Sequence, residues 1–150
     1  MAFRGLLAGA LAVSGGVALA EPAAPGGADL IIADFNSGTK PNNLGGDFGA
    51  WIADPADPQQ GCIESFERTN RFGTRGYSLR LIYSVDSERP AFGGLWMRLA
   101  GLDARPFAGL ALRVRGDAAL GHTTTFKVEL KDDRGQVSRF QVREIGRAHV

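Results

Sequence analysis

Apolar and polar side chains alternate over short segments between residues 29 and 144, and no long segment shows apolar residues at helical spacing. Side chains of a β-strand point to opposite faces in turn, so alternation over about four to eight residues is typical of a half-buried strand. Segments of this kind, bounded by residues such as Gly, Pro, Asp and Asn, are predicted to be strands: 30–35, 48–53, 61–66, 77–86, 92–99, 110–115, 124–131 and 137–143. Short strands at regular spacing without helices indicate an all-β fold, a β-sandwich.

In each of these segments the residues at every second position carry the large apolar side chains, so these residues form the predicted core. In the later segments its members are Tyr77, Leu79, Leu81, Tyr83, Val85, Leu95, Met97, Leu99, Leu110, Leu112, Val114, Phe126, Val128, Leu130, Phe140 and Val142. Trp51 lies among Phe48 and Ile52 and is assigned to the core as well. Residues 132–135, Asp-Asp-Arg-Gly, have the composition of a hairpin loop in which Gly supplies a positive φ angle.

The opposite parity of the later strands is polar and mostly basic. Its charged and amide members are Arg98, Arg113, Arg115, Lys127, Glu129, Lys131, Arg139, Gln141 and Arg143. Trp96 is the exception, because it falls between Leu95 and Met97 and is out of phase with the predicted core. An indole on a polar sheet face is a candidate platform for a sugar. The alternative is that the face only keeps the outside of the sheet hydrated.

A sugar-binding surface needs an aromatic plane for the C–H groups of the sugar ring and bidentate donors for its hydroxyls. Trp96 supplies the plane, and Arg98, Arg80 and Glu129 are candidate polar contacts. Asn43 joins them because the loop at residues 42–46 is rich in amide side chains and glycine. The basic character of the face favours an acidic polysaccharide as the ligand.

Asp34, Asn36 and Asp47 are candidate ligands of a structural calcium ion, since they flank loops and carry the oxygen atoms that calcium prefers. The segment that begins at Asp34 is not an EF-hand, because Gly38 arrives one position early. Ordinary turn chemistry is the alternative explanation for all three residues.

Few residues favour catalysis. His122 is the only histidine before residue 145, and it lies in a loop between Gly121 and Thr123, where turn roles are common. No nucleophile elbow, phosphate-binding loop or zinc-binding spacing occurs. The 17 Lys and Arg residues nearly balance the 16 Asp and Glu residues, which argues against nucleic acid as a partner. We therefore expect a binding protein and not an enzyme.

The two ends of the chain are expected to lie outside the domain. Residues 1–20 have a basic start, an apolar centre and the small-x-small ending Ala18-Leu19-Ala20, which predicts a signal peptide, and a transmembrane anchor is the weaker alternative. Residues 21–28 are a flexible leader rich in Pro, Ala and Gly. Residues 145–150, Ile-Gly-Arg-Ala-His-Val, match a translated sequencing adapter, with a natural basic tail as the alternative. The domain then covers residues 29–144 and is expected to be truncated at its C-terminal end.

Export predicts a periplasmic or secreted protein, a compartment that permits disulfides. Cys62 is the single cysteine, so no disulfide forms within the chain. It is either a small buried apolar residue or a thiol whose partner lies elsewhere.

Several ordered pieces together resemble the galactose-binding-like jelly-roll superfamily. They are Asp34-Phe35-Asn36, Gly76-Tyr77-Ser78-Leu79-Arg80-Leu81, the run from Leu110 to Asp117, and Phe126-Lys127-Val128-Glu129-Leu130-Lys131. The pieces are similar to family 11 carbohydrate-binding modules and to the complex I intermediate-associated protein family. The resemblance implies a jelly-roll β-sandwich over residues 29–143 that binds a glycan or, in the second family, a protein partner in assembly. A third reading is the binding appendage of a glycoside hydrolase encoded downstream. The closing strands of the family are absent, so none of its ligand residues is carried over.

Overall fold

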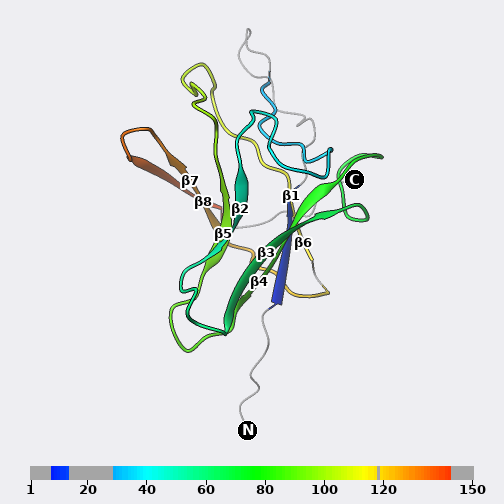
Figure 1. Cartoon of the computed structure of the whole chain (residues 1–150), viewed down its shortest axis with the longest axis vertical. Coiled ribbons are helices and arrows are strands. Elements are labelled where there is room, and N and C mark those ends of the chain that lie inside the picture. Colours follow the sequence, from blue (N-terminus) through cyan, green and yellow to red (C-terminus); the bar gives the residue numbers. More distant parts are fainter. Residues whose placement is uncertain (1–7, 14–28, 118, 143–150) are drawn as a thin grey trace.

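The computed structural model describes residues 8–13, 29–117 and 119–142, with side chains from residue 29 onward (Figure 1). These residues form strands and turns without any helix, and therefore offer no helix that could cross a membrane. The strands are β1 (Ala8–Val13), β2 (Phe48–Ile52), β3 (Gln60–Glu67), β4 (Ser78–Val85), β5 (Gly93–Met97), β6 (Val114–Gly116), β7 (Phe126–Lys131) and β8 (Val137–Val142).

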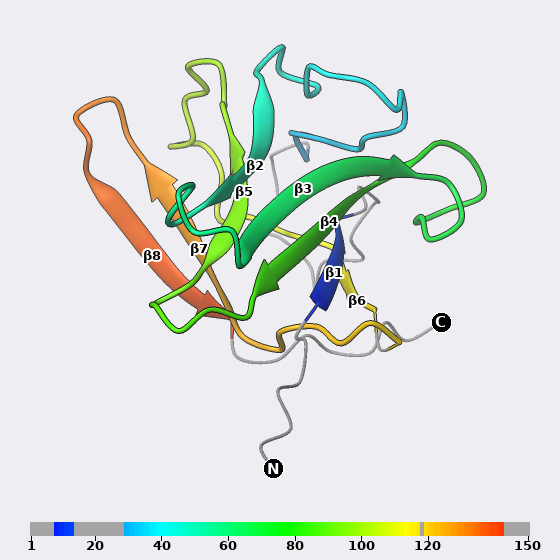
Figure 2. The same ribbon diagram turned by 60° about the horizontal axis from the view of Figure 1, so that its bottom comes forward.

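The strands assemble into three antiparallel sheets. One sheet has the order β3-β4-β1-β6, and the pairs β2-β5 and β7-β8 form the other two. The hairpin β7-β8 lies to one side of β5 (Figure 2). Its loop closes as predicted: the N–H of Asp132 donates to the carbonyl of Gln136 at 3.0 Å, and Gly135 has a φ angle of 81°. The all-β prediction is confirmed, and small antiparallel sheets are consistent with a sandwich.

The core lies between the β2-β5 pair and the β3-β4 part of the larger sheet. Phe48 in β2 is fully buried, and its ring meets those of Phe35 at 5.5 Å and Phe66 at 6.3 Å, both edge to face. Leu79 and Leu81 on β4 are 1% and 5% exposed, as their strand parity predicts. Ala33, Leu95 and Met97 pack around the same centre and are partly buried.

Residues 30–35 are not a strand, so that prediction is wrong. Phe35 adopts a left-handed φ of 57°, and the side chain of Asp34 accepts the N–H of Asn36 at 3.0 Å. The chain therefore turns here and inserts the Phe35 ring into the core as part of a loop. An apolar run shows that side chains need burial, but it does not show that the backbone is extended.

The core prediction is also wrong for Leu110, Leu112 and Phe140, which are 44%, 46% and 54% exposed. Of the segment 110–115, only the last two residues join β6, so Leu110 and Leu112 precede any strand pairing. Phe140 belongs to a sheet of two strands, and such a pair buries little by itself. Correct alternation in these segments was not sufficient for burial.

Glu64 on β3 ties the free edge of β2 to the core. Its carboxylate accepts the N–H of Ala50 at 2.8 Å and the Nζ of Lys40 at 3.0 Å. The same Lys40 Nζ lies 5.1 Å from the centroid of the Phe48 ring. Burial acts to raise the pKa of Glu64, but the hydrogen bonds from Lys40 and Ala50 outweigh it, and the pKa is lowered. The ionised form is therefore the one that stabilises the fold.

Strand β1 falls within the predicted signal peptide. Its residues pair with β4 on one side and β6 on the other, and Leu11 lies opposite both Leu81 and Gly116. The remainder of residues 1–20, the leader 21–28 and residues 145–150 lie outside the described residues. The strand occupies the centre of the largest sheet, so its presence affects the pairing of both neighbours.

We predict that Glu64 stabilises the protein at neutral pH and that this contribution is lost as the pH falls through and below 4.5, the ordinary pKa of the group. In Glu64→Gln the free energy of unfolding should fall by about 1 kcal/mol at neutral pH and depend less on pH in the acid range. Urea unfolding at a series of pH values measures both effects. Asp133→Asn, an exposed control in the hairpin loop, should follow the wild-type curve, and an identical curve for Glu64→Gln would contradict the prediction.

We predict that a chain starting at Glu21 is less stable than one starting at Ala8, because β4 and β6 lose the strand between them. The expected loss is roughly 1 kcal/mol for each backbone hydrogen bond removed. Thermal unfolding and hydrogen exchange of the β4 amides compare the two chains. Equal melting temperatures and equal protection of β4 would show that β1 adds no stability.

Candidate functional site

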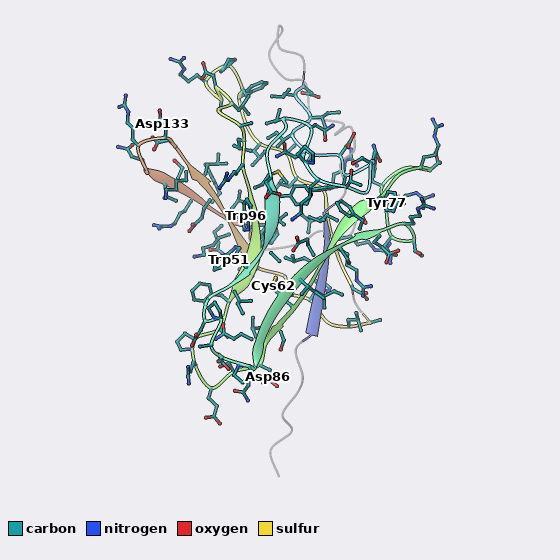
Figure 3. The ribbon with its side chains drawn as sticks, viewed as in Figure 1. Trp51, Cys62, Tyr77, Asp86, Trp96 and Asp133 are labelled. Atoms are coloured by element: carbon teal, nitrogen blue, oxygen red, sulfur yellow. The ribbon has the colours of Figure 1, made fainter. Side chains whose placement is uncertain are left out.

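The outer face of the β2-β5 pair displays both tryptophans of the chain (Figure 3). In the strand register Phe48 faces Met97, whereas Trp96 faces Gly49 and Trp51 faces Gly94. Residues directly opposite each other in an antiparallel pair project from the same side of the sheet. Phe48 is buried on the inner side, so Trp51 and Trp96 share the outer side, where they are 42% and 38% exposed.

Each indole lies over a glycine of the opposite strand. A β-carbon at Gly49 would lie 3.1 Å from Nε1 of Trp96, and one at Gly94 would lie 3.1 Å from Nε1 of Trp51. Any larger residue would have to displace the ring, so the two glycines let the rings settle close to the backbone. Each strand therefore contributes one tryptophan and one glycine: Trp96 on β5 faces Gly49 on β2, and Trp51 on β2 faces Gly94 on β5.

Phe92 extends the row of exposed rings. Its carbonyl accepts the N–H of Ala53 at 2.8 Å, which continues the β2-β5 pairing by one step. Its ring is 57% exposed and meets the Trp51 ring edge to face, with centroids 5.8 Å apart and planes at 80°. We call Trp96, Trp51 and Phe92 the aromatic stripe.

Arg98 supplies a cation at one end of the aromatic stripe. Its guanidinium lies 5.9 Å from the centroid of the Trp96 ring, close to the outer limit of a cation–π contact. Its own N–H donates to the carbonyl of Asp47 at 2.8 Å, so the backbone at this position is fixed. Within the described part of the chain no carboxylate forms an ion pair with Arg98. The group is therefore available to a ligand.

A buried amide braces the loop beside Arg98. Asn42 is 6% exposed, and its Oδ1 accepts the N–H groups of Leu44 at 3.0 Å and Gly46 at 2.8 Å. Its Nδ2 donates to the carbonyl of Arg98 at 2.8 Å. The amide nitrogen and the amide oxygen of Asn42 are thus both hydrogen-bonded. These bonds fix the loop at residues 42–46 to the end of β5.

The predicted ligand residues do not all meet. Trp96 and Arg98 lie together, but Arg80 is in β4 and contacts Glu67 at 3.8 Å, in another sheet. Glu129 is in β7, where Arg139 donates to it at 2.8 Å and holds its pKa below the usual value. Asn43 serves the loop, because its Oδ1 accepts the N–H of Asp34 at 3.1 Å.

The candidate calcium ligands have local partners. Besides the turn that Asp34 makes with Asn36, the carboxylate of Asp47 accepts the N–H of Phe48 at 2.8 Å and lies 3.8 Å from Lys40. No cluster of three or more His, Cys, Asp or Glu side chains suited to a metal occurs in the described residues. The Asp34 contact is of the turn type that the sequence offered as the alternative, whereas Asp47 bonds to the adjacent residue and to Lys40.

Cys62 and His122 each lie against a neighbouring strand, β5 for Cys62 and β6 for His122. The Cys62 side chain is half-buried on β3, with its sulfur 3.7 Å from the carbonyl oxygen of Gly94, and burial raises the pKa of the thiol. This thiol packs beneath the same strand that carries Trp96. The His122 ring lies against Gly116 at the end of β6.

The sequence prediction for Trp51 is wrong, because this residue is exposed and not part of the core. The signal that identified Trp96 was also present for Trp51, which is out of phase with Phe48 and Ile52. Phe92 begins the predicted strand 92–99 and has the same phase as Trp96, but it was not singled out. For the two tryptophans, the facing glycines Gly49 and Gly94 were the further clue.

We predict that Asn42→Asp destabilises the protein by about 2 kcal/mol, because a carboxylate oxygen would replace the amide that donates to the buried carbonyl of Arg98. Urea unfolding measures the loss. Asn43→Asp is the matched control, since it keeps the oxygen that accepts the Asp34 N–H, and it should change stability by less than about 0.5 kcal/mol. Equal effects of the two changes would disprove the bracing role of Asn42.

Known proteins provide no template for this site. Comparisons of the chain with protein-family models, with curated proteins and with solved structures found no match. The resemblance to the galactose-binding-like superfamily rests on the sequence motifs alone. The function of the chain is therefore inferred from the geometry of its own residues.

Proposed function

We propose that this chain is an exported, non-catalytic binding module that recognises a carbohydrate through the aromatic stripe. One observation carries the proposal: Trp51 and Trp96 project from the same outer sheet face and are 42% and 38% exposed. Tryptophan is mostly buried in folded proteins, and exposed aromatic patches mark interaction sites. In the proposal the fold is a galactose-binding-like jelly roll, and residues 1–20 direct the chain to the periplasm or the medium.

A sugar fits the chemistry of this face. Indole and phenyl rings offer apolar planes to the C–H groups of a pyranose, and the indole also carries an N–H donor. The adjacent Arg98 has a planar guanidinium that can donate two parallel hydrogen bonds to vicinal hydroxyls or to a carboxylate. This combination distinguishes the aromatic stripe from Phe72, an exposed ring that lies 3.9 Å from the Arg113 guanidinium but has no second ring beside it among the described residues.

An acidic glycan suits the site better than a neutral one. Arg98 lacks an ion-pair partner among the described residues, whereas Arg80, Arg139 and Arg105 each contact a carboxylate of the protein. The positive charge of Arg98 is therefore available to a ligand at the Trp96 end of the aromatic stripe. A uronate carboxylate would satisfy it.

We predict that polygalacturonate in a native gel retards the protein more strongly than hydroxyethyl cellulose. Trp51→Ala and Trp96→Ala should each weaken binding by about two- to tenfold, the range of a single aromatic contact. Added salt should weaken binding to polygalacturonate further, because the Arg98 contact is exposed. Phe72→Ala, which removes an exposed ring from the loop between β3 and β4, is the control and should bind as the wild type does.

Absence of retardation in both gels would disprove the carbohydrate proposal. A pull-down then tests the alternative function, binding of a protein partner in assembly. A stoichiometric protein that is captured by the wild type and lost with Trp96→Ala would support that alternative.

A further inference from the structure

We propose that the loop between β3 and β4, together with the arginines beside it at β6, docks this protein on the headgroups of an anionic phospholipid membrane. This interaction surface is separate from the aromatic stripe and does not depend on the glycan proposal. Two features point to it: a group of arginines and an exposed apolar ring among them. We call residues 68–76, Arg113 and Arg115 the arginine surface.

The arginine surface collects positive charge from two segments that are distant in sequence. Residues 68–76, Arg-Thr-Asn-Arg-Phe-Gly-Thr-Arg-Gly, contain three arginines and no acidic residue. Arg113, just before β6, has its guanidinium 3.9 Å from the centroid of the Phe72 ring. Arg115 in β6 donates through Nη1 to Oδ1 of Asn70 at 3.1 Å. The loop and β6 therefore present their arginines together.

Most of this charge has no acidic partner in the protein. Within residues 29–117 and 119–142, no carboxylate forms an ion pair with Arg68, Arg75 or Arg115. Glu67 at the end of β3 precedes the loop directly, and it contacts Arg80 outside the loop at 3.8 Å. The negative surface potential of an anionic leaflet attracts basic clusters of this kind.

Phe72 gives the arginine surface an apolar contact. Its side chain is 43% exposed, with the Arg113 guanidinium lying over the ring. At a membrane surface such a ring can leave water at the boundary of the acyl chains while the flanking guanidinium groups stay with the phosphates. A small soluble anion would engage the arginines and leave the ring in water. The ring therefore favours a bilayer as the partner.

Hydrogen bonds hold the loop in a defined shape. The guanidinium of Arg71 donates to the carbonyls of Arg68 and Thr74, to the second at 2.6 Å. At the base of the loop, Oγ of Ser78 donates to the carbonyl of Asn70 at 2.6 Å. A loop that is already ordered loses less conformational entropy when it binds.

The position of the loop suits contact with a flat surface. It projects beyond the ends of β3 and β4 (Figure 2). Tyr77, where the loop meets β4, lies well apart from Trp51 and Trp96 (Figure 3). A membrane contact at the arginine surface therefore leaves the aromatic stripe open to its own ligand.

The test is co-sedimentation of the complete protein with sucrose-loaded vesicles. One set contains phosphatidylglycerol and phosphatidylcholine in equal parts, and the other contains phosphatidylcholine alone. We expect binding to the anionic vesicles to be stronger by about tenfold or more, because the neutral vesicles lack the surface potential that attracts arginine. Added salt should release the protein from the anionic vesicles, because it screens exposed charges.

Substitutions separate the two parts of the contact. Arg68→Ser and Arg75→Ser should each weaken binding to the anionic vesicles about fivefold, the effect of one basic residue at such a surface. Phe72→Ala should weaken it by roughly three- to tenfold through the lost apolar contact. Arg134→Ser, which changes an exposed arginine in the β7-β8 loop, and Trp96→Ala are the matched controls and should bind as the wild type does. Every variant keeps residues 1–150, so any contribution of the leader is the same in all.

Binding to neither kind of vesicle, equal binding to both, or equal losses in the loop variants and the controls would overturn the proposal. Long-chain inorganic polyphosphate tests a soluble polyanion as the partner instead. If the two arginine variants lose both polyphosphate and vesicles while Phe72→Ala binds vesicles as the wild type does, the surface is a general anion site and the membrane proposal is wrong. The glycan proposal is judged separately, because its gels contain no lipid and depend on the two tryptophans.

Discussion

The register between β2 and β5 is the constraint on which the rest of the structure depends. With Phe48 opposite Met97, the apolar side chains of both strands enter the core, and the two tryptophans face outward over glycines. A shift of one residue would reverse the two faces, exposing Phe48 and burying two indoles. The fully buried ring of Phe48, packed edge to face against Phe35 and Phe66, makes such a shift costly. The same packing that forms the core therefore orients the candidate site.

Polar groups hold this register at the margins of the pair. Glu64 satisfies an N–H on the edge of β2 that faces β3, and Asn42 fastens a loop to the carbonyl of Arg98 at the end of β5. Both side chains have their hydrogen-bonding atoms matched, and unmatched buried polar atoms would be costly. Stability and site geometry thus share residues, since the loop that Asn42 closes also fixes the position from which Arg98 reaches Trp96.

Strands β1 and β6 of the larger sheet and the hairpin depend less on this centre. Ala8–Val13 joins β4 to β6, so a segment with the composition of a leader also completes a sheet. The hairpin β7-β8 pairs with itself and keeps Phe140 exposed, while Leu110 and Leu112 are exposed before β6. These elements carry apolar surface that the described residues do not cover, in contrast to the closely packed region around Phe48.

Local alternation by itself determined most of the strand segments, the hairpin at residues 132–135 and the outward phase of Trp96, because the two-residue period of a strand is visible in adjacent residues. It also placed Arg98 beside Trp96, two residues away in sequence. The outward phase of Trp51 was likewise present in the sequence, but only the tertiary structure decided that Trp51 lies beside Trp96. The strand that pairs with β2 is more than forty residues further along the chain, and pairing over such a distance leaves no local pattern. The loop at Phe35 and the exposure of Leu110 were decided in the same way, since burial depends on what packs against a segment and not on its own sequence.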